Sequence, residues 1–219
     1  MKCVNLLFFI AICIGNYFYI TVGGLLIKSI TSALFASLGF INMVYALKQN
    51  KKYKKFYLAM SIGLILAMLG DIFLEIEFIL GAALFAMGHI GFLIAYCFSQ
   101  KIRGLDVIIS LVFFACVAVF MLYSPIVVFD DPIMKWVCLI YAFVISLMLG
   151  KALGNFIKKK DNVTGTIALG SILFTISDFM LLLSLFVELW SWTGEVCLAT
   201  YYPAEFLLAY SIYARANKK

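Results

Sequence analysis

The sequence predicts an all-α integral membrane protein, a polytopic helical bundle of eight transmembrane helices with both termini facing the cytoplasm. Composition and the placement of basic residues carry this prediction. Of the 219 residues, 65% are hydrophobic and only 13% are charged, whereas a soluble domain is nearer half apolar and a quarter charged. Too little polar surface remains to cover a soluble core of this composition. The chain therefore needs a bilayer as its solvent.

Charged residues and turn residues divide the chain into eight apolar stretches. Each is long enough to cross about 30 Å of hydrocarbon at a rise of about 1.5 Å per residue. They fill the chain, so we expect one transmembrane domain, residues 1–219, with no separate soluble domain. The predicted spans lie near 4–22, 29–47, 56–76, 78–99, 105–123, 134–153, 165–187 and 193–213.

The basic residues set the orientation of these spans. Of the seventeen lysines and arginines, all but Lys28 and Lys135 lie near the two termini or after the second, fourth and sixth spans. Basic residues in short loops favour the cytoplasmic side, and both termini share that side only if the span number is even. The net charge of +6 is thus explained by topology, and we expect no nucleic-acid partner. The pattern fits a bacterial inner membrane, or a eukaryotic endomembrane or plasma membrane.

Ionisable side chains inside the predicted spans are the candidates for function, because each costs about 2.5–3.5 kcal/mol on insertion scales. Four of these side chains stand out, and with the spans alternating in direction all four fall between the membrane centre and the non-cytoplasmic side, where we expect them to line one cavity. They are Asp71, His89, Asp178 and Glu205, with Lys28 at the edge of the second span.

Two tyrosines, Tyr201 and Tyr202, precede Glu205 by four and three residues, so their hydroxyls and its carboxyl share a helix face. An alternative interpretation is that these polar groups only hydrogen-bond one another and hold the bundle together. That interpretation suits His89 and Glu205. It suits Asp71 and Asp178 less well, because two buried anions repel each other.

If Asp71 and Asp178 face each other, they cannot easily both ionise, and the pair then holds one proton at neutral pH. Such a pair offers an acid and a base on either side of a substrate. An acid and a base in this arrangement could catalyse the hydrolysis of a peptide, glycosidic, acetal or vinyl ether bond. The residues alone leave these reactions open.

The cysteines and the single histidine argue against a metal site. Six cysteines are scattered through apolar stretches with no C-x-x-C pair, so neither a disulfide framework nor a zinc site is indicated. A zinc hydrolase with several histidine ligands is excluded, since His89 stands alone. We expect no metal and no organic cofactor.

Four segments carry glycine, aromatic and acidic residues in a fixed order: 70–74 (GDIFL), 81–98 (GAALFAMGHIGFLIAYCF), 170–181 (GSILFTISDFML) and 200–205 (TYYPAE). In sequence and in span position they resemble the lysoplasmalogenase family, the YhhN-like transmembrane proteins. The family patterns are G-D-x-x-L, G-x-x-x-F-x-x-x-H-x-x-Y-x-x-x-F, G-x-x-x-F-x-x-S-D and T-Y-Y-x-A-Q. Each motif alone is weak, and four in register along nearly the whole chain are specific.

Three positions depart from the family pattern. Phe92 stands where the family often has tyrosine, Lys28-Ser29 replaces a common Lys-Pro, and Glu205 replaces glutamine. An acid in place of a neutral amide puts the choice of substrate in question more than the type of reaction.

The resemblance implies an ether hydrolase. Its reaction is cleavage of the vinyl ether of a lysoplasmalogen to a fatty aldehyde and glycerophospho-ethanolamine or glycerophospho-choline. The implied partners are this lysophospholipid and membrane lipids, and no oligomeric state follows. Asp71 and Asp178 are the implied catalytic pair, with acid and base not distinguished between them. The supporting residues, which would orient water and carboxyls or bind the lipid phosphate, are His89, Tyr201, Tyr202, Glu205 and, for the phosphate, Lys28.

Two other functions fit aspartates in a membrane. An intramembrane aspartyl protease carries one aspartate in a G-x-G-D context, but Met68 occupies the first glycine position here and no Tyr-Asp dipeptide surrounds Asp178. A non-catalytic lipid-binding or proton-coupled transport bundle also fits, since acids in spans carry protons. Aldehyde release from lysoplasmalogen separates the first function from these two.

Overall fold

The computed structural model describes residues 1–129, 131–187 and 192–218, and these residues form eight α-helices with no strand among them. A short 3-10 helix, Lys51–Tyr53, leads into the third. The all-helical fold predicted from the sequence is confirmed. The helices are α1 (Lys2–Val22), α2 (Leu25–Gln49), α3 (Lys54–Phe73), α4 (Phe78–Ser99), α5 (Gly104–Tyr123), α6 (Pro132–Lys159), α7 (Asn162–Phe186) and α8 (Thr193–Ala216).

Seven of these helices, α1 to α7, are long and apolar enough to cross a membrane, so the chain is a multi-pass integral membrane protein. The eighth helix, α8, falls outside those limits although it has 24 residues. It packs against α1, α2, α3 and α7, and its ionisable residues Glu205 and Arg215 are buried. Because protein rather than lipid covers much of α8, its surface does not have to be uniformly apolar.

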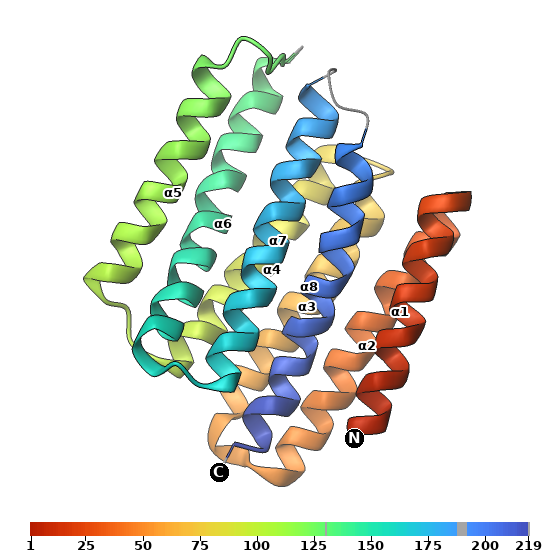
Figure 1. Cartoon of the computed structure of the whole chain (residues 1–219), viewed down its shortest axis with the longest axis vertical. Helices are drawn as coiled ribbons and strands as arrows, with labels where there is room; N and C mark the ends of the chain where they lie inside the picture. Colours follow the sequence, from red (N-terminus) through yellow and green to blue (C-terminus); the bar gives the residue numbers. More distant parts are fainter. Residues whose placement is uncertain (130, 188–191, 219) are drawn as a thin grey trace.

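Six helices enclose the interior of the bundle. Going round, α2 packs on α3, α3 on α4, α4 on α6, α6 on α7, α7 on α8, and α8 on α2. Outside this ring, α1 lies against α2 and α8, and α5 lies against α6 (Figure 1). Both termini lie at one end of the bundle (Figure 1). We call this the terminal end and the opposite one the distal end.

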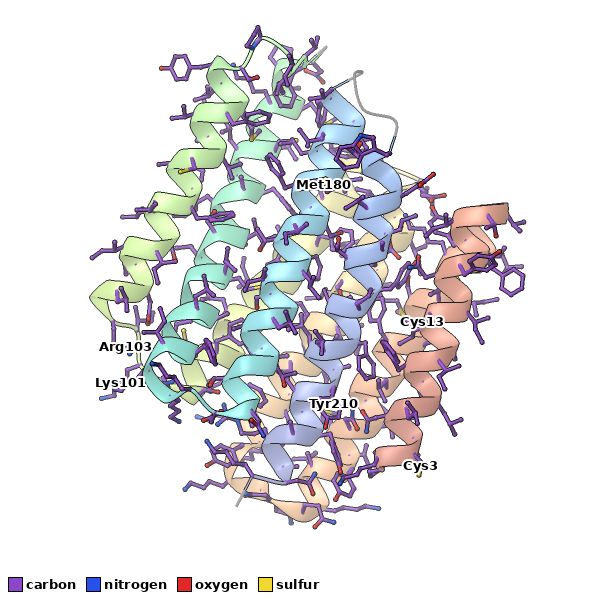
Figure 2. The ribbon with its side chains drawn as sticks, in the orientation of Figure 1. Cys3, Cys13, Lys101, Arg103, Met180 and Tyr210 are labelled. Atoms are coloured by element: carbon purple, nitrogen blue, oxygen red, sulfur yellow. The ribbon has the colours of Figure 1, made fainter. Side chains whose placement is uncertain are left out.

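Side chains on the outside of the bundle follow this arrangement. Lys101 and Arg103 lie near the terminal end, between α4 and α5 (Figure 2). On α1, Cys3 and Cys13 are exposed (Figure 2), and all six cysteines of the chain are free. Lys101 and Arg103 thus lie at the end of the bundle that the sequence predicts to be cytoplasmic.

The helix that differs most from its predicted span is α6, which continues to Lys159 instead of ending near 153. Lys151 is buried there, and its Nζ lies 2.7 Å from the Oδ2 of Asp106 on α5. Gly154 lets α5 approach, because a Cβ at that position would lie 1.8 Å from the Oδ1 of Asp106. In the sequence, Lys151 and Gly154 resemble the end of a span. In the structure, both residues contact Asp106 of the neighbouring helix.

Candidate active site

Asp71 lies in the last turn of α3, at the distal end, and is buried. Its Oδ1 is 3.2 Å from the Nζ of Lys28 in the first turn of α2. Its Oδ2 accepts a hydrogen bond from Ser32, one turn further along α2, and another at 3.2 Å from Tyr202 of α8. An ammonium and two hydroxyls all donate to this carboxyl, which is the arrangement that satisfies an ionised carboxylate.

A second carboxyl, Glu75, shares the same lysine. Glu75 follows the end of α3, and its Oε1 is 3.2 Å from the Nζ of Lys28. It also accepts a hydrogen bond from Tyr19 near the end of α1. Partial burial by itself raises the pKa of Glu75, but the hydrogen bond from Tyr19 and the charge of Lys28 outweigh it and hold the pKa below its usual range. A paired lysine and two acids therefore lie together at the distal end.

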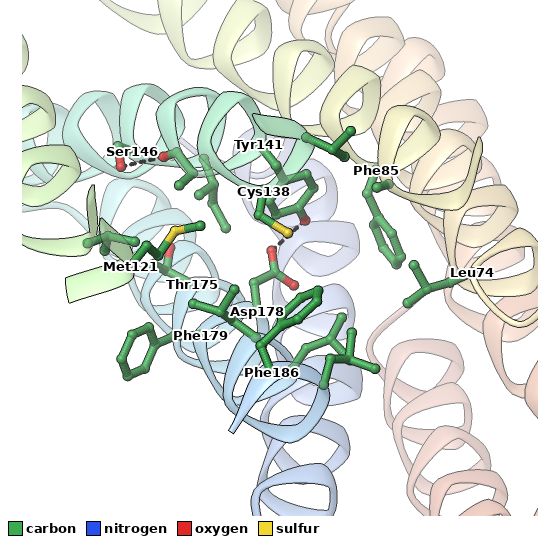
Figure 3. Close-up of a pocket in the computed structure, with 18 of the residues that line it drawn as sticks. Leu74, Phe85, Met121, Cys138, Tyr141, Ser146, Thr175, Asp178, Phe179 and Phe186 are labelled. Carbon is green, nitrogen blue, oxygen red and sulfur yellow. Dashed lines mark hydrogen bonds between the residues drawn. The ribbon is translucent and has the colours of Figure 1, made fainter. Parts of the chain in front are cut away.

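Asp178, on α7, has a separate set of partners. Tyr141 of α6 donates to its Oδ2 at 2.6 Å, and the Nε2 of His89 on α4 lies 3.2 Å from the same oxygen. The His89 Nε2 is also 2.8 Å from the Tyr141 hydroxyl. Figure 3 shows Tyr141 and Asp178 pointing toward each other across a pocket. Three helices thus each contribute one member of this cluster.

Tyr141 is the member of the site that the sequence reasoning missed. It is one of twelve tyrosines in the chain, and a phenol in an apolar span is common because its ring is largely hydrophobic. No motif surrounds it. Its hydroxyl lies within a predicted span, which could have marked it as a candidate. Among the tyrosines, the sequence singled out only Tyr201 and Tyr202, because they stand beside Glu205.

Close helix packing positions Asp71. At the preceding residue, Gly70, a Cβ would lie 2.8 Å from the ring of Phe85 and 2.9 Å from its backbone nitrogen, so only glycine lets α3 approach α4 this closely. The ring of Phe85 in turn lies 5.9 Å from that of Tyr201, edge to face. Tyr201 also packs on Phe174 at 5.4 Å. These three rings form one aromatic cluster, which contacts Gly70 through Phe85.

One cavity of about 800 Å³, the polar cavity, is lined by both Asp71 and Asp178. Lys28, Glu75 and Tyr201 also line it. Among the described residues, no hydrogen bond joins the two aspartates, and each carboxyl has its own partners. The structure therefore brings the predicted pair to one cavity, and it does not bring the two carboxyls into direct contact.

A second cavity of about 740 Å³, the apolar cavity, lies between α4, α5, α6 and α7. Figure 3 shows Met121, Phe179 and Phe186 among the apolar side chains around it. Asp178 lines this cavity as well as the polar one. It is the acid that the two cavities share.

Glu205 lies apart from both cavities. It is 0% exposed, and within the described part of the chain neither of its carboxyl oxygens has a hydrogen-bond partner. The three predicted residues of α8 thus have different surroundings. Tyr202 contacts Asp71, Tyr201 lines the polar cavity, and Glu205 does neither.

Side chains that could hold a metal ion are not grouped within the part of the chain that the structure describes. In residues 1–129, 131–187 and 192–218, no three histidine, cysteine, aspartate or glutamate side chains lie close enough to ligate one ion. The polar groups of the site are carboxyls, hydroxyls, one imidazole and one ammonium. Their chemistry is that of proton transfer and of binding charged groups.

Comparison with known proteins places the chain in a family. No curated protein and no solved structure matches it significantly. The model of one family, described as the YhhN family, matches residues 24–212. That match covers most of the chain and includes the helices that carry Lys28, Asp71, His89 and Asp178. The chain belongs to the YhhN family.

Proposed function

We propose that this protein is a lysoplasmalogenase that hydrolyses the vinyl ether of a lysoplasmalogen to a fatty aldehyde and a glycerophospho-ethanolamine or glycerophospho-choline. The single observation that carries the proposal is that Asp71 and Asp178 line one cavity with different partners. Membership of the YhhN family, which includes lysoplasmalogenases, supports it. The multi-pass membrane bundle suits a substrate that is itself a membrane lipid.

The first step of the proposed reaction is proton transfer to carbon. One of the two aspartates, as a carboxylic acid, gives its proton to the outer alkenyl carbon. The double-bond electrons form the new C–H bond, and the ether oxygen shares its lone pair with the inner carbon to give an oxocarbenium ion. The other aspartate, as a carboxylate, stabilises that cation electrostatically.

Water completes the reaction. It attacks the inner carbon and loses a proton to the carboxylate, which gives a hemiacetal. The aspartate that acted first as acid then removes the hemiacetal hydroxyl proton, the bond to the glycerol oxygen breaks, and that oxygen takes the proton held by the other aspartate. Both carboxyls return to their starting states, one water is consumed, and the residues alone perform every proton transfer.

The remaining polar residues have supporting roles in this proposal. His89 and Tyr141 orient the Asp178 carboxyl through the contacts described above. Tyr202 does the same for Asp71. Lys28 binds the lipid phosphate as a point charge while it remains beside Asp71.

The test is aldehyde release from lysoplasmenyl-ethanolamine and lysoplasmenyl-choline by the purified protein in lipid nanodiscs. Stoichiometric release of aldehyde and of the glycerophospho product is expected. The matched control substrate is the saturated alkyl ether lysolipid, which has no double bond to protonate and should remain intact. A folded protein that releases no aldehyde from either vinyl ether would overturn the proposed reaction.

We also propose that all eight helices cross the membrane and that the terminal end is cytoplasmic. The clustering of basic residues at that end supports this orientation. Reporter fusions at Lys219 and within the loop at 124–129 should report opposite sides of the membrane. The same side for both would mean that the number of spans is wrong.

A further inference from the structure

We propose that the apolar cavity between α4, α5, α6 and α7 is the binding site for the hydrocarbon chain of the lysolipid, with the headgroup in the polar cavity and the chain's ether end beside Asp178. This inference rests on the proposed function for the identity of the lipid. The occupant is one alkyl or alkenyl chain. Four observations carry the argument.

The first observation is the chemistry of the apolar cavity. Its empty volume of about 740 Å³ includes space that opens toward the outside of the bundle, and apolar side chains make up most of its lining. Of its hydroxyl residues, Thr175 and Ser146 donate to backbone carbonyls one turn back on their own helices, at 2.8 Å and 2.6 Å. Since those hydroxyl protons are already used, the wall presents mainly carbon to an occupant, which favours hydrocarbon over a polar ligand.

The second observation is charge complementarity in the polar cavity. Lys28 supplies a positive charge and Glu75 a negative one on its wall. The side chain of Glu75 is 35% exposed, so it remains accessible to a ligand. A phosphate next to Lys28 and an ammonium next to Glu75 match the two charges of a zwitterionic lysolipid headgroup. The polar cavity therefore suits the headgroup and the apolar cavity suits the chain.

The third observation is that the two cavities adjoin. They share lining residues from α4, from the distal half of α7 and from the segment that follows α3, so a molecule can extend from one into the other. In a lysoplasmalogen the vinyl ether joins the chain to the glycerol, and it would lie at this junction. Among the shared residues one is ionisable, and the whole shared set is Leu74, Phe78, Phe85, Asp178, Leu181 and Leu185.

The fourth observation is the extent and the opening of the apolar cavity. Along α5 its lining runs from Phe113 to Met121, a length of about 12 Å at 1.5 Å per residue. Phe113 is 36% and Leu185 48% exposed, so the wall reaches the outer surface of the bundle between α5 and α7. A chain can therefore enter sideways from the bilayer without leaving hydrocarbon.

Photo-crosslinking tests the site without relying on turnover. The probe is a saturated alkyl ether lysophosphoethanolamine that carries a diazirine at the end of its chain, used with the wild-type protein in phosphatidylcholine nanodiscs. Lipid-facing residues will label non-specifically, so the informative label is the part that excess unlabelled lysophosphoethanolamine competes away. We expect that competed label on α5 and α6 residues that line the apolar cavity. Competed label confined to other faces of the bundle would overturn the proposal.

A matched pair of valines sharpens the test. Val117 lines the apolar cavity, whereas Val119, two residues further along α5, is 57% exposed on the outer surface. Val117→Trp should lower the competed label about tenfold, equivalent to about 1.4 kcal/mol of binding free energy, and Val119→Trp should leave it unchanged. Val117→Phe provides a milder version of the same change if the tryptophan variant does not fold. Equal labelling of folded Val117 and Val119 variants would contradict the site.

Hydrolysis and chain binding can fail separately. Competed label in the cavity together with no aldehyde release would overturn the proposed reaction and support the chain site. Aldehyde release together with competed label elsewhere would overturn the chain site alone. In an active protein, Val117→Trp should raise KM for a long-chain lysoplasmalogen and have less effect on a short-chain one, whereas Val119→Trp should change neither.

Discussion

Two buried lysine–aspartate pairs lie at opposite ends of the bundle, and they differ in what surrounds them. At the terminal end, Asp106 in the first turn of α5 lies 2.7 Å from Lys151 and 3.0 Å from Arg103. At the distal end, Asp71 lies 3.2 Å from Lys28. Both pairs are buried, yet Asp71 lines a cavity and Asp106 lines neither of the two cavities described above.

The packing around Asp106 explains the difference. Its Oδ1 faces Gly154 so closely that a methyl group at that position would overlap it, and the nearby Ser110 bonds the Asp106 carbonyl. Asp71, by contrast, lies on the wall of the polar cavity, which residues of α2, α7 and α8 also line. A buried ion pair by itself therefore indicates cohesion between helices, and access to a cavity distinguishes a candidate for chemistry.

The largest expected effect is on kcat, and it should distinguish Asp71 and Asp178 from Asp106. Asp71→Asn and Asp178→Asn keep shape and hydrogen bonding but remove the exchangeable proton, so each should lower kcat by about 100-fold or more. The double variant should be scarcely slower than either single one, because the two act as a unit. Asp106→Asn should keep kcat per folded molecule. An aldehyde assay normalised to the monodisperse folded fraction measures all four variants, and near-normal turnover of Asp71→Asn or Asp178→Asn would refute the proposed mechanism.

Replacing Lys151 should mainly lower the stability of the protein, whereas replacing Lys28 should mainly weaken substrate binding. Lys151→Met leaves Asp106 with Arg103 alone in a closed environment, and breaking a buried pair in this way costs about 3–5 kcal/mol. Lys28→Met should cost less, since Asp71 keeps two hydroxyl donors and borders a cavity. It should raise KM for lysoplasmalogen instead. Thermal unfolding in nanodiscs together with KM gives both readouts, and equal losses of stability would show that the two ends are packed alike.

Glu205 is a third buried acid, and a smaller effect is expected there. It has no described hydrogen-bond partner and lines neither cavity, so Glu205→Gln should retain turnover within a few-fold of wild type. The amide should at most shift the pH profile or the headgroup preference. If the folded Glu205→Gln protein lost all activity, its carboxyl would have to join the proton-transferring groups.

The smallest effect concerns a carboxyl outside the spans. Asp161 accepts from the amide of Thr164 and from Lys218. Its partial burial raises the pKa, but the hydrogen bonds and charge of these partners outweigh it and lower the pKa to about 2. Because the folded-state pKa is depressed, the stabilisation is complete above the unfolded value of 3.8 and is lost as pH falls through about 2.

Asp161→Ala therefore should destabilise the protein by about 1 kcal/mol at neutral pH, as expected for a lost helix cap. Lys218→Met should cost less, since exposed pairs contribute about 0–1 kcal/mol. The difference in melting temperature between wild type and Asp161→Ala should shrink as pH is lowered from 5 toward 2. A difference that stays constant over that range would mean that the Asp161 charge contributes nothing.

Several elements of the fold were predictable because lipid imposes them. A chain that is 65% hydrophobic must satisfy its backbone within helices, and the predicted spans overlap all eight observed helices. The end of α6 was missed because Gly154 and Lys151 resemble a boundary in the sequence while both are contacts with Asp106 in the structure. The number of spans stays a prediction, since α8 is shielded by neighbouring helices and its hydropathy does not decide the matter.

The sequence by itself determined that the chain is helical and membrane-embedded and that ionisable residues in its spans are candidates for function, because an apolar solvent makes each of them costly. Only the tertiary structure decided which of these residues meet. It placed Lys28 beside Asp71, joined His89 and Tyr141 to Asp178, and set Glu205 apart. The limits of an apolar stretch show where along its helix a residue lies. Which side chains of other helices it contacts depends on how the helices are rotated and packed. Glycines at close helix contacts, such as Gly70, control that packing through residues distant in sequence.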